Sequence, residues 1–365
     1  RPTSETVIGH MYSKWVQSWR DLPILINQWA NVMRWEKRPR LFLRTSEFLW
    51  QEGHTAHSTR EEAMEETLKM LGVYARIMRD ILALPVVEGE KTEGERFPGA
   101  DNTYACETMM SDGKALQAGT SHFLGQNFAR AFDIKFQNQN GDLEYAWTTS
   151  WGVSTRLIGA IIMTHSDDDG LVLPPRVAPV KAAILPIGTN EEKINSALLP
   201  RAMELSSELD RSLGGRCTVV DKQFYLRPGD RFFQHLQRGV PLRVELGEKD
   251  LAAGTARVVR RDSGEKMDIP LENLASRVSV LLEDIQSGLF NRALDFRKKN
   301  TSVVSTYEEM KIVLEEKGGF IETWFAGSRD DEKKIKEETG ATGRCMPIDS
   351  TEKGTCFYTG KPGAR

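Results

Sequence analysis

The stretch from Arg44 to His54, RTSEFLWQEGH, sets charged side chains directly among aromatic ones. Side chains two residues apart on a β-strand point to the same face, so Trp50, Glu52 and His54 share one face of the strand predicted here. Charges beside aromatic rings are costly unless a ligand or partner group satisfies them. The stretch therefore predicts a pocket for a small ligand with both ionic and apolar parts.

Further pairs of polar residues lie two positions apart and share a face wherever the chain is extended. A polar face on an antiparallel sheet is often simply a solvated face, and this alternative carries about half the weight for any one pair. Several pairs close to aromatic residues shift the balance toward a binding site. The pairs are Arg34 with Glu36, Thr120 with His122, and Thr3 with Glu5, the last two if GTSH and RPTSET are extended.

Three arginines from separate segments predict a phosphate site. Arg34 and Arg44 flank one hairpin loop, and Arg156 follows Ser154 near a predicted helix start. Guanidinium groups match phosphate oxygens through paired hydrogen bonds, so their convergence would indicate a triphosphate. Taken singly, each arginine is more often a surface salt bridge. Neither a GxxxxGK[ST] loop nor a GxGxxG turn after a strand is present in the sequence.

The chain has 365 residues, of which 39% are hydrophobic and 28% charged, and this predicts more than one domain. The net charge of -3 provides no global attraction to nucleic acid or membrane. The four cysteines form no CxxC pair, and we find neither a membrane-length apolar run nor a signal peptide. We therefore expect a cytoplasmic protein without membrane contact. Because the chain opens on Arg1 and not Met, we expect that an N-terminal segment is missing.

Hydrophobic periodicity predicts two kinds of architecture along the chain. The first part favours an antiparallel hairpin, an amphipathic helix and further strands. After the proline-rich connector at about residue 174, strands alternate with helices, which predicts a small α/β unit with a largely parallel sheet. The predicted elements are strands over 25–36 and 48–54, a helix over 61–84, strands and loops over 86–128, a strand and helix over 145–165, a helix over 191–213, a helix near 231–238 and a long helix from 274.

Longer motifs resemble a known family. RWE followed by FLRTSEFLWQEGH resembles motif 2 of class II aminoacyl-tRNA synthetases, and WGVSTRLIGA resembles their motif 3. Together with RPTSET, GTSHFLGQNF and GLVLPPRVAP, these motifs resemble the prolyl-tRNA synthetase family in its archaeal/eukaryotic-like architecture. The resemblance spans almost the whole chain.

The resemblance implies an α+β fold with three domains. It predicts an antiparallel-sheet catalytic domain over 1–175, a small α/β anticodon-binding domain over 176–280 and a C-terminal α/β domain over 281–365. Relatives of the bacterial type insert an editing domain between motifs 2 and 3. The interval 57–117 is too short for one. Clearance of mischarged alanine would then need a separate protein.

The resemblance also implies roles for individual residues in activating L-proline with ATP and loading it onto tRNA(Pro). Arg34 would touch both the proline carboxylate and the α-phosphate, and Arg156 would stabilise the phosphate charge. Phe48 would stack on adenine, and Gln117 would also position Mg²⁺. Trp50 could equally be a core residue. The implied proline-binding residues are Thr3, Glu5, Arg34, Trp50, Phe97 and His122, and the implied ATP-binding residues are Arg34, Glu36, Arg44, Thr45, Phe48, Gln117, Thr120, Ser154 and Arg156.

The sequence departs from the family in two regions. The motif 1 helix, which builds the family's homodimer interface, would lie before Arg1. The family's zinc cysteines are also incomplete, because Phe325 and Tyr358 stand where cysteines are expected. Cys345 and Cys356 alone cannot supply the four ligands of a structural zinc site, so no zinc is expected.

Other interpretations remain open at this point. A relative that activates threonine, serine or histidine is disfavoured by PTSET and GTSHFLGQNF. A paralogue that binds tRNA without catalysis is disfavoured by the intact arginines and carboxylates of motifs 2 and 3. The basic segments 257–261 and 297–299 could touch RNA phosphates, although a solvated charged face explains each of them at least as well.

Overall fold

The protein is described from a computed structural model, and the described residues are 3–190, 192, 194–350 and 352–364. The chain folds into two compact units. The first unit comprises Arg1–Arg79, Pro85–Ala160 and Asp295–Arg365, and the second comprises Asp80–Leu84 and Ile161–Leu294. The expected domain boundaries near residues 175 and 280 stay predictions. Residues 295–365 belong to the same compact unit as the start of the chain.

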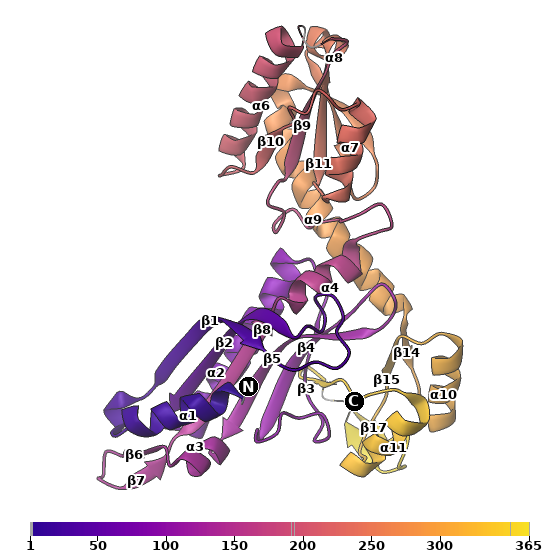
Figure 1. Cartoon of the computed structure of the whole chain (residues 1–365). Helices are drawn as coiled ribbons and strands as arrows, with labels where there is room; N and C mark the ends of the chain where they lie inside the picture. Colours follow the sequence, from indigo (N-terminus) through magenta and orange to yellow (C-terminus); the bar gives the residue numbers. More distant parts are fainter. Residues whose placement is uncertain (1–2, 191, 193, 351, 365) are drawn as a thin grey trace. The chain divides into compact units, whose positions relative to one another are not determined.

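A seven-stranded sheet forms the centre of the first unit, with every neighbouring pair of strands antiparallel (Figure 1). The strand order is β1-β2-β8-β5-β4-β3-β16, so the last strand comes from the C-terminal part of the chain. The strands are β1 (Ile24–Met33), β2 (Glu47–His57), β3 (Val87–Glu90), β4 (Asn102–Met109), β5 (Ala115–Gly125), β8 (Trp147–Ser154) and β16 (Met346–Pro347).

The predicted hairpin is confirmed. Strands β1 and β2 pair without interruption from Ile24 opposite Ala56 to Met33 opposite Glu47. The backbone N–H of Arg34 donates to the carbonyl oxygen of Ser46 at 2.8 Å and extends the ladder by one step. Both ends of the hairpin loop are thus held by paired strands, and this fixes the backbone positions from which Arg34 and Arg44 extend.

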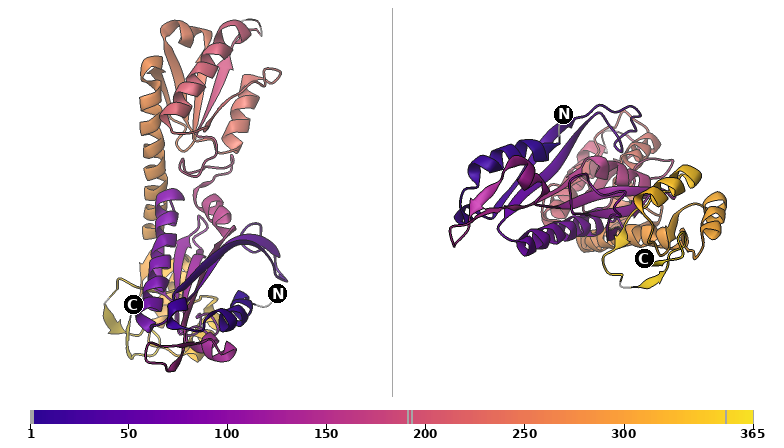
Figure 2. Two further views of the ribbon diagram at one scale, coloured as in Figure 1. Left: turned by 90° about the vertical axis from the view of Figure 1, so that its left-hand side faces the viewer. Right: turned by 90° about the horizontal axis from the view of Figure 1, so that it is seen from below.

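Helices cover both faces of this sheet (Figure 2). On one face, the predicted amphipathic helix is confirmed as α2 (Arg60–Arg76), capped by Thr59 and continued by a π-helical turn over Ile77–Ile81. Its Tyr74 donates to the side-chain carbonyl of Gln51 at 2.7 Å. On the other face, α1 (Ser4–Trp15) and α3 (Asn127–Phe132) pack around the buried Tyr12.

The C-terminal part of the first unit is a small mixed structure. It contains the parallel pair β14 with β15 and an aromatic-rich core that includes Met310, Ile335 and Phe357. Capping boxes at Thr306 and Ser328 define the helix starts. The elements are β14 (Thr301–Val303), α10 (Tyr307–Glu316), β15 (Phe320–Glu322), α11 (Arg329–Thr339), β17 (Lys353–Thr355) and β18 (Pro362–Ala364); the small hairpin β6 (Lys135–Gln137) and β7 (Leu143–Tyr145) lies earlier in the chain.

The second unit is an α/β structure around a five-stranded sheet in the order β10-β9-β11-β12-β13. The prediction of a largely parallel sheet is confirmed for β10, β9 and β11, which are parallel, and is wrong for β12 and β13, which form an antiparallel hairpin after β11. The elements are β9 (Ala182–Ile187), α6 (Leu199–Ser212), β10 (Thr218–Val220), α7 (Pro228–Gln237), β11 (Leu242–Gly247), α8 (Glu248–Ala253), β12 (Thr255–Arg260) and β13 (Lys266–Pro270).

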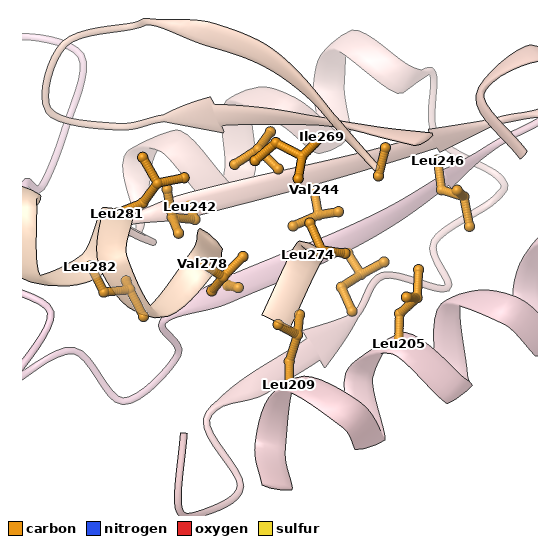
Figure 3. Packing of buried hydrophobic residues seen from close by; sticks show 14 of the residues in the cluster. Leu205, Leu209, Leu242, Val244, Leu246, Ile269, Leu274, Val278, Leu281 and Leu282 are labelled. Atoms are coloured by element: carbon orange, nitrogen blue, oxygen red, sulfur yellow. The ribbon is translucent and has the colours of Figure 1, made fainter. Parts of the chain in front are cut away.

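Aliphatic side chains from helices and from strands pack together in the core of the second unit. Leu205 and Leu209 of α6 and Val278 of α9 meet the strand residues Leu242 and Val244 (Figure 3). Helices α4 (Arg156–His165) and α9 (Leu274–Lys299) cross the unit boundaries along the chain. The predicted helix over 191–213 begins among residues that are not all described, and its regular α-helical part is α6. In the described part of the chain, no helix has the length and apolar character needed to cross a bilayer.

Candidate active site

The register of the central strands gathers the predicted site residues on one face of the sheet. Glu52 of β2 lies opposite Gln28 of β1 and Gly152 of β8, and Gly152 lies opposite Thr120 of β5. Directly opposite residues in adjacent strands share a face, so Glu52 and Thr120 project to the same side. Gly152 adds no side chain between them, which leaves this row open above the sheet.

The next row along the same face carries two histidines. His54 lies opposite Ser150, which lies opposite His122, which in turn lies opposite Thr103. The ring of His122 lies 4.6 Å from that of Phe97, and its Nδ1 atom is 3.1 Å from the Thr103 hydroxyl. Burial lowers the pKa of His122 to about 4. His122 is thus neutral at pH 7, and its ring forms an aromatic wall with that of Phe97, at an interplanar angle of 30°.

A β-bulge explains how Gln117 joins this face. Thr120 is paired with Ala105 and Gly119 with Cys106, but Glu107 is paired with Gln117, so Ala118 is the extra residue. An extra residue reverses the alternation of side chains beyond it. Gln117 and Thr120 therefore lie on the same face although they are three positions apart.

Arg34 stands over the aromatic residues at the end of the hairpin. Its guanidinium carbon is 5.0 Å from the centre of the Trp50 ring and 5.7 Å from that of Phe48. The two rings meet edge to face, with their centroids 5.7 Å apart. Cation–π contacts of this kind restrict the side chain while leaving its N–H groups available for anions.

Arg156, the first residue of α4, is held by backbone carbonyls. Its Nε atom donates to the oxygen of Leu43 at 3.1 Å and its Nη1 atom to that of Gln117 at 3.2 Å. Burial, and then the nearby charge of Arg44, lower the pKa of Arg156, while Glu107 acts in the opposite direction. The structure therefore brings Arg156 to the hairpin loop that carries Arg44.

The hairpin loop itself is more exposed. Arg44 is 64% exposed, and its Nε atom is 3.3 Å from a carboxylate oxygen of Glu36. The hydroxyl of Thr45 donates to the carbonyl oxygen of Glu47 at 2.7 Å. Ser154, at the end of β8, accepts from the backbone N–H of Arg156 at 3.3 Å. Thr45 and Ser154 thus stabilise local turns, and of these residues Arg44 extends furthest into solvent.

Thr3 and Glu5 meet, but not through an extended segment. Helix α1 begins at Ser4, with Thr3 as its N-cap residue and Glu5 in its first turn. The condition for Thr3 and Glu5 to share a strand face, an extended RPTSET, is therefore not met at Ser4–Glu5, where the helix dipole favours a carboxylate. The Thr3 hydroxyl still donates to the Glu5 carboxylate. The charge of Glu5 acts on the pKa of His122, so the first turn of α1 reaches the same face of the sheet.

No role was predicted from the sequence for a buried ion pair on this same face of the sheet, toward the edge formed by β3. Lys91 donates to Glu107 at 2.6 Å, and both side chains are nearly inaccessible to solvent. Arg344, just before β16, lies 3.9 Å from the same carboxylate. No local pattern marks these residues, because the pair forms only when β3, β4 and the C-terminal segment come together.

The region where the resemblance places zinc is filled by aromatic rings. Phe325 and Tyr358 belong to a cluster with Tyr307 and Phe357. The sulfur of Cys356 accepts a backbone N–H from residue 359; burial acts to raise the pKa of this thiol, and hydrogen bonds lower it overall. Among the described residues, no group of three or more His, Cys, Asp or Glu side chains could hold a metal. This donor set does not fit a structural zinc ion.

The antiparallel sheet and its arginine-rich face define the class of protein, and comparison with known families agrees. Residues 1–165 match the class II tRNA synthetase core domain that serves the G, H, P, S and T enzymes. Residues 181–281 match an anticodon binding domain. The chain thus combines a class II aminoacyl-tRNA synthetase core with an anticodon-binding module, and the α+β fold class is confirmed.

The last part of the chain narrows the class. Residues 307–365 match the C-terminal domain of prolyl-tRNA synthetase. The chain is 54% identical to the proline--tRNA ligase of Flavobacterium johnsoniae, with 100% of this chain and 74% of the relative covered. It is 52% identical to that of Amoebophilus asiaticus (99% and 73% covered) and 54% identical to that of Roseiflexus castenholzii (99% and 75% covered). The chain belongs to the prolyl-tRNA synthetase family of ligases.

Proposed function

We propose that this chain activates L-proline with ATP to form prolyl-adenylate and transfers the prolyl group to the 3′ end of tRNA(Pro) for protein biosynthesis. The carrying observation is the single face of the antiparallel sheet that collects Arg34, Arg156, Gln117 and His122 from different strands and loops. Family membership supports the same reaction.

The proline site would lie between the first turn of α1 and the aromatic wall. Glu5 places a carboxylate where a secondary ammonium would bind, and Thr3 orients that carboxylate. Phe97, whose ring packs at a tilt against the neutral His122, would enclose one side of the pyrrolidine ring. Trp50, which lies beside Arg34, would enclose another. Arg34 would then reach the proline carboxylate.

The ATP site would follow the hairpin and the start of α4. Phe48 would stack on adenine, and Arg34 and Arg156 would meet the phosphates. Mg²⁺ bound with ATP would neutralise phosphate charge, and Gln117, on the same face as Thr120, is the residue that would position it. The remaining proposed contacts are Glu36, Arg44, Thr45, Thr120 and Ser154.

The chemistry requires positioning and charge stabilisation more than a nucleophilic side chain. The proline carboxylate attacks the α-phosphorus and pyrophosphate leaves, which places extra negative charge on phosphate oxygens. Arg34 and Arg156 are held in place before the reaction by rings and backbone carbonyls, so they stabilise that charge without reorganising. The tRNA ribose hydroxyl then attacks the carbonyl carbon of the adenylate, so that the prolyl ester of the tRNA forms and AMP leaves.

The architecture would be the form without an inserted editing domain. Residues 60–125 are occupied by α2 and by β3, β4 and β5 of the central sheet, which supports this assignment. The proposed domains are 1–175, 176–280 and 281–365, with the second contacting the anticodon. The ion pairs of Arg257 with Asp268 and of Arg261 with Asp167 argue against the RNA contacts predicted for segment 257–261, because both arginines already have an acidic partner.

A homodimer in the cytoplasm is the proposed state. Strand β1 is an edge strand of the sheet, and its face opposite Gln28 carries Leu25, Trp29 and Met33. Trp29 is 83% exposed and Met33 66% exposed. Apolar strips of this kind on an edge strand are typical of association surfaces.

Proline-dependent ATP–pyrophosphate exchange tests the function directly. Threonine, serine, histidine and alanine serve as controls in the same assay. We expect exchange with proline and much weaker exchange with alanine, because ring packing and the imino nitrogen distinguish the two. Exchange that depends on threonine, serine or histidine instead would overturn the assignment, and so would an absence of exchange with all five.

A further inference from the structure

We propose that Glu52 is a positioning residue that holds the proline-binding turn of α1 against the sheet. The inference rests on the proposed function, because the proline site is part of that proposal. It assigns Glu52 to the proline site and not to the ATP site. Glu52 touches none of the groups that react in the proposed activation step. It acts through Ser4, the residue between Thr3 and Glu5.

The carboxylate of Glu52 joins three separate elements. Its Oε1 atom accepts from the Ser4 hydroxyl of α1 at 2.8 Å and from the Gln28 amide of β1 at 2.5 Å. Its Oε2 atom lies 3.2 Å from Nε2 of His54 on its own strand. Glu52, Ser4 and His54 are all at most 5% exposed. The helix start, the edge strand and the central strand therefore meet at one buried acid.

The charge state of Glu52 agrees with this arrangement. Burial alone would raise the pKa of Glu52, but hydrogen bonds from His54 and Ser4 more than offset it, and the pKa is lowered overall. Hydrogen bonds to an ionised acceptor are about twice as strong as neutral ones. Ser4 is thus fixed by a stronger bond than a serine hydroxyl usually makes.

The position of Ser4 in the chain explains why this bond concerns proline. Ser4 is the first residue of α1, so fixing its side chain fixes the backbone that presents Thr3 and Glu5. Trp50, two residues from Glu52 on β2, projects to the same face and would wall the pyrrolidine ring. One buried carboxylate therefore sets the distance between the imino-binding acid and the ring-binding aromatic residue.

The test compares three variants of the full chain, Glu52→Gln, Ser4→Ala and Ser13→Ala. Glu52→Gln keeps the size of the side chain but removes its charge. Ser4→Ala removes the link and keeps Glu52. Ser13→Ala is the matched control, since the Ser13 hydroxyl donates within α1, to the carbonyl oxygen of His10 at 2.9 Å. Steady-state ATP–pyrophosphate exchange gives KM for proline and for ATP separately.

We expect Glu52→Gln and Ser4→Ala each to raise KM for proline about tenfold, the size expected for losing a hydrogen bond to a charged group. We expect KM for ATP to change less than about twofold in each variant, and Ser13→Ala to match the wild type. The double variant should resemble the single variants, because residues that act through one contact are not additive.

Three other results overturn the inference. If KM for proline is unchanged in Glu52→Gln while the wild type is active, Glu52 does not position the proline turn. If both KM values rise together with a fall in Tm, its role is general stability. If the wild type shows no exchange with proline, the proposed function itself fails and the inference fails with it.

Discussion

Arg156 donates from its Nη1 atom to the backbone carbonyl of Gln117 at 3.2 Å, across 39 residues of sequence. The bond joins the start of α4 to the bulged segment of β5, and so connects two proposed ATP-binding residues. The rigid part of this arrangement is the backbone of the sheet. Catalytic geometry that rests on backbone carbonyls depends little on side-chain flexibility.

Replacing Arg156 by alanine should remove most activation. We expect Arg156→Ala to lower kcat for proline-dependent exchange by at least about 100-fold, as is typical when a group that stabilises transition-state charge is removed. The matched control is Arg257→Ala, which removes an exposed ion pair with Asp268 in the second unit and should leave exchange unchanged. An Arg156→Ala enzyme with near-normal exchange would contradict the proposed role.

Gln117 should affect ATP and Mg²⁺ but not proline. We expect Gln117→Ala to raise KM for ATP about tenfold, in line with the loss of one polar contact to a charged ligand, and to require more Mg²⁺ for half-maximal exchange. KM for proline should stay near the wild-type value. A larger change in KM for proline than in KM for ATP would contradict the assignment of Gln117 to the ATP site and would indicate a role in the proline site.

The proposed dimer predicts a response to charge on the edge strand. Trp29→Lys places a charge on the apolar strip of β1 and should shift the mass measured by sedimentation velocity toward the monomer at micromolar concentrations. Trp35→Lys is the matched control, because Trp35 is as exposed but lies in the loop beyond β1. Identical sedimentation of the wild type and Trp29→Lys would rule out this strip as the association surface.

Residue types and spacing predicted the hairpin, helix α2, the strand–helix unit of β8 and α4, and the face shared by Trp50, Glu52 and His54. They did not predict the bulge at Ala118, since a bulge depends on which residue of β4 lies opposite. They also did not predict helix α1, because a Thr-x-Glu sequence fits an extended segment and a helix N-terminus equally well.

The second unit shows the same limit of local patterns. Alternating strands and helices correctly predicted an α/β structure, and the parallel strands β10, β9 and β11 agree with it. The antiparallel hairpin of β12 and β13 follows directly after β11 and α8, and the pattern of single strands does not reveal its direction. The Lys91–Glu107 pair was missed for a related reason, because Lys91 directly follows β3 and Glu107 belongs to β4.

Two buried histidines predict that stability falls in mild acid. Burial lowers the pKa of both His122 and His165 to about 4, against an ordinary value of 6.5. Between these values the unfolded chain binds protons that the folded chain does not, so the free energy of unfolding decreases as pH falls from about 6.5 to 4. The loss should be present in full below pH 4.

The variant His165→Gln isolates one of these contributions away from the proposed site. His165 lies beside the carbonyl oxygen of Leu82 at 3.1 Å, and an amide can keep that bond without titrating. We expect urea unfolding of His165→Gln to show a smaller loss of stability between pH 7 and pH 5 than the wild type. Equal losses in both proteins would mean that His165 keeps its ordinary pKa when folded.

The aromatic cluster in the C-terminal part predicts stability without zinc. Phe325 and Tyr358 pack where the family resemblance places cysteine ligands, and four N or S ligands are needed for a structural site. We expect purified protein to contain well under one zinc per chain by plasma mass spectrometry, and the chelator EDTA to leave its Tm unchanged. Tyr358→Ala should lower Tm, because the ring packs edge to face on Tyr307 with centroids 5.1 Å apart. One zinc per chain, lost together with Tm on chelation, would show that other residues complete a metal site.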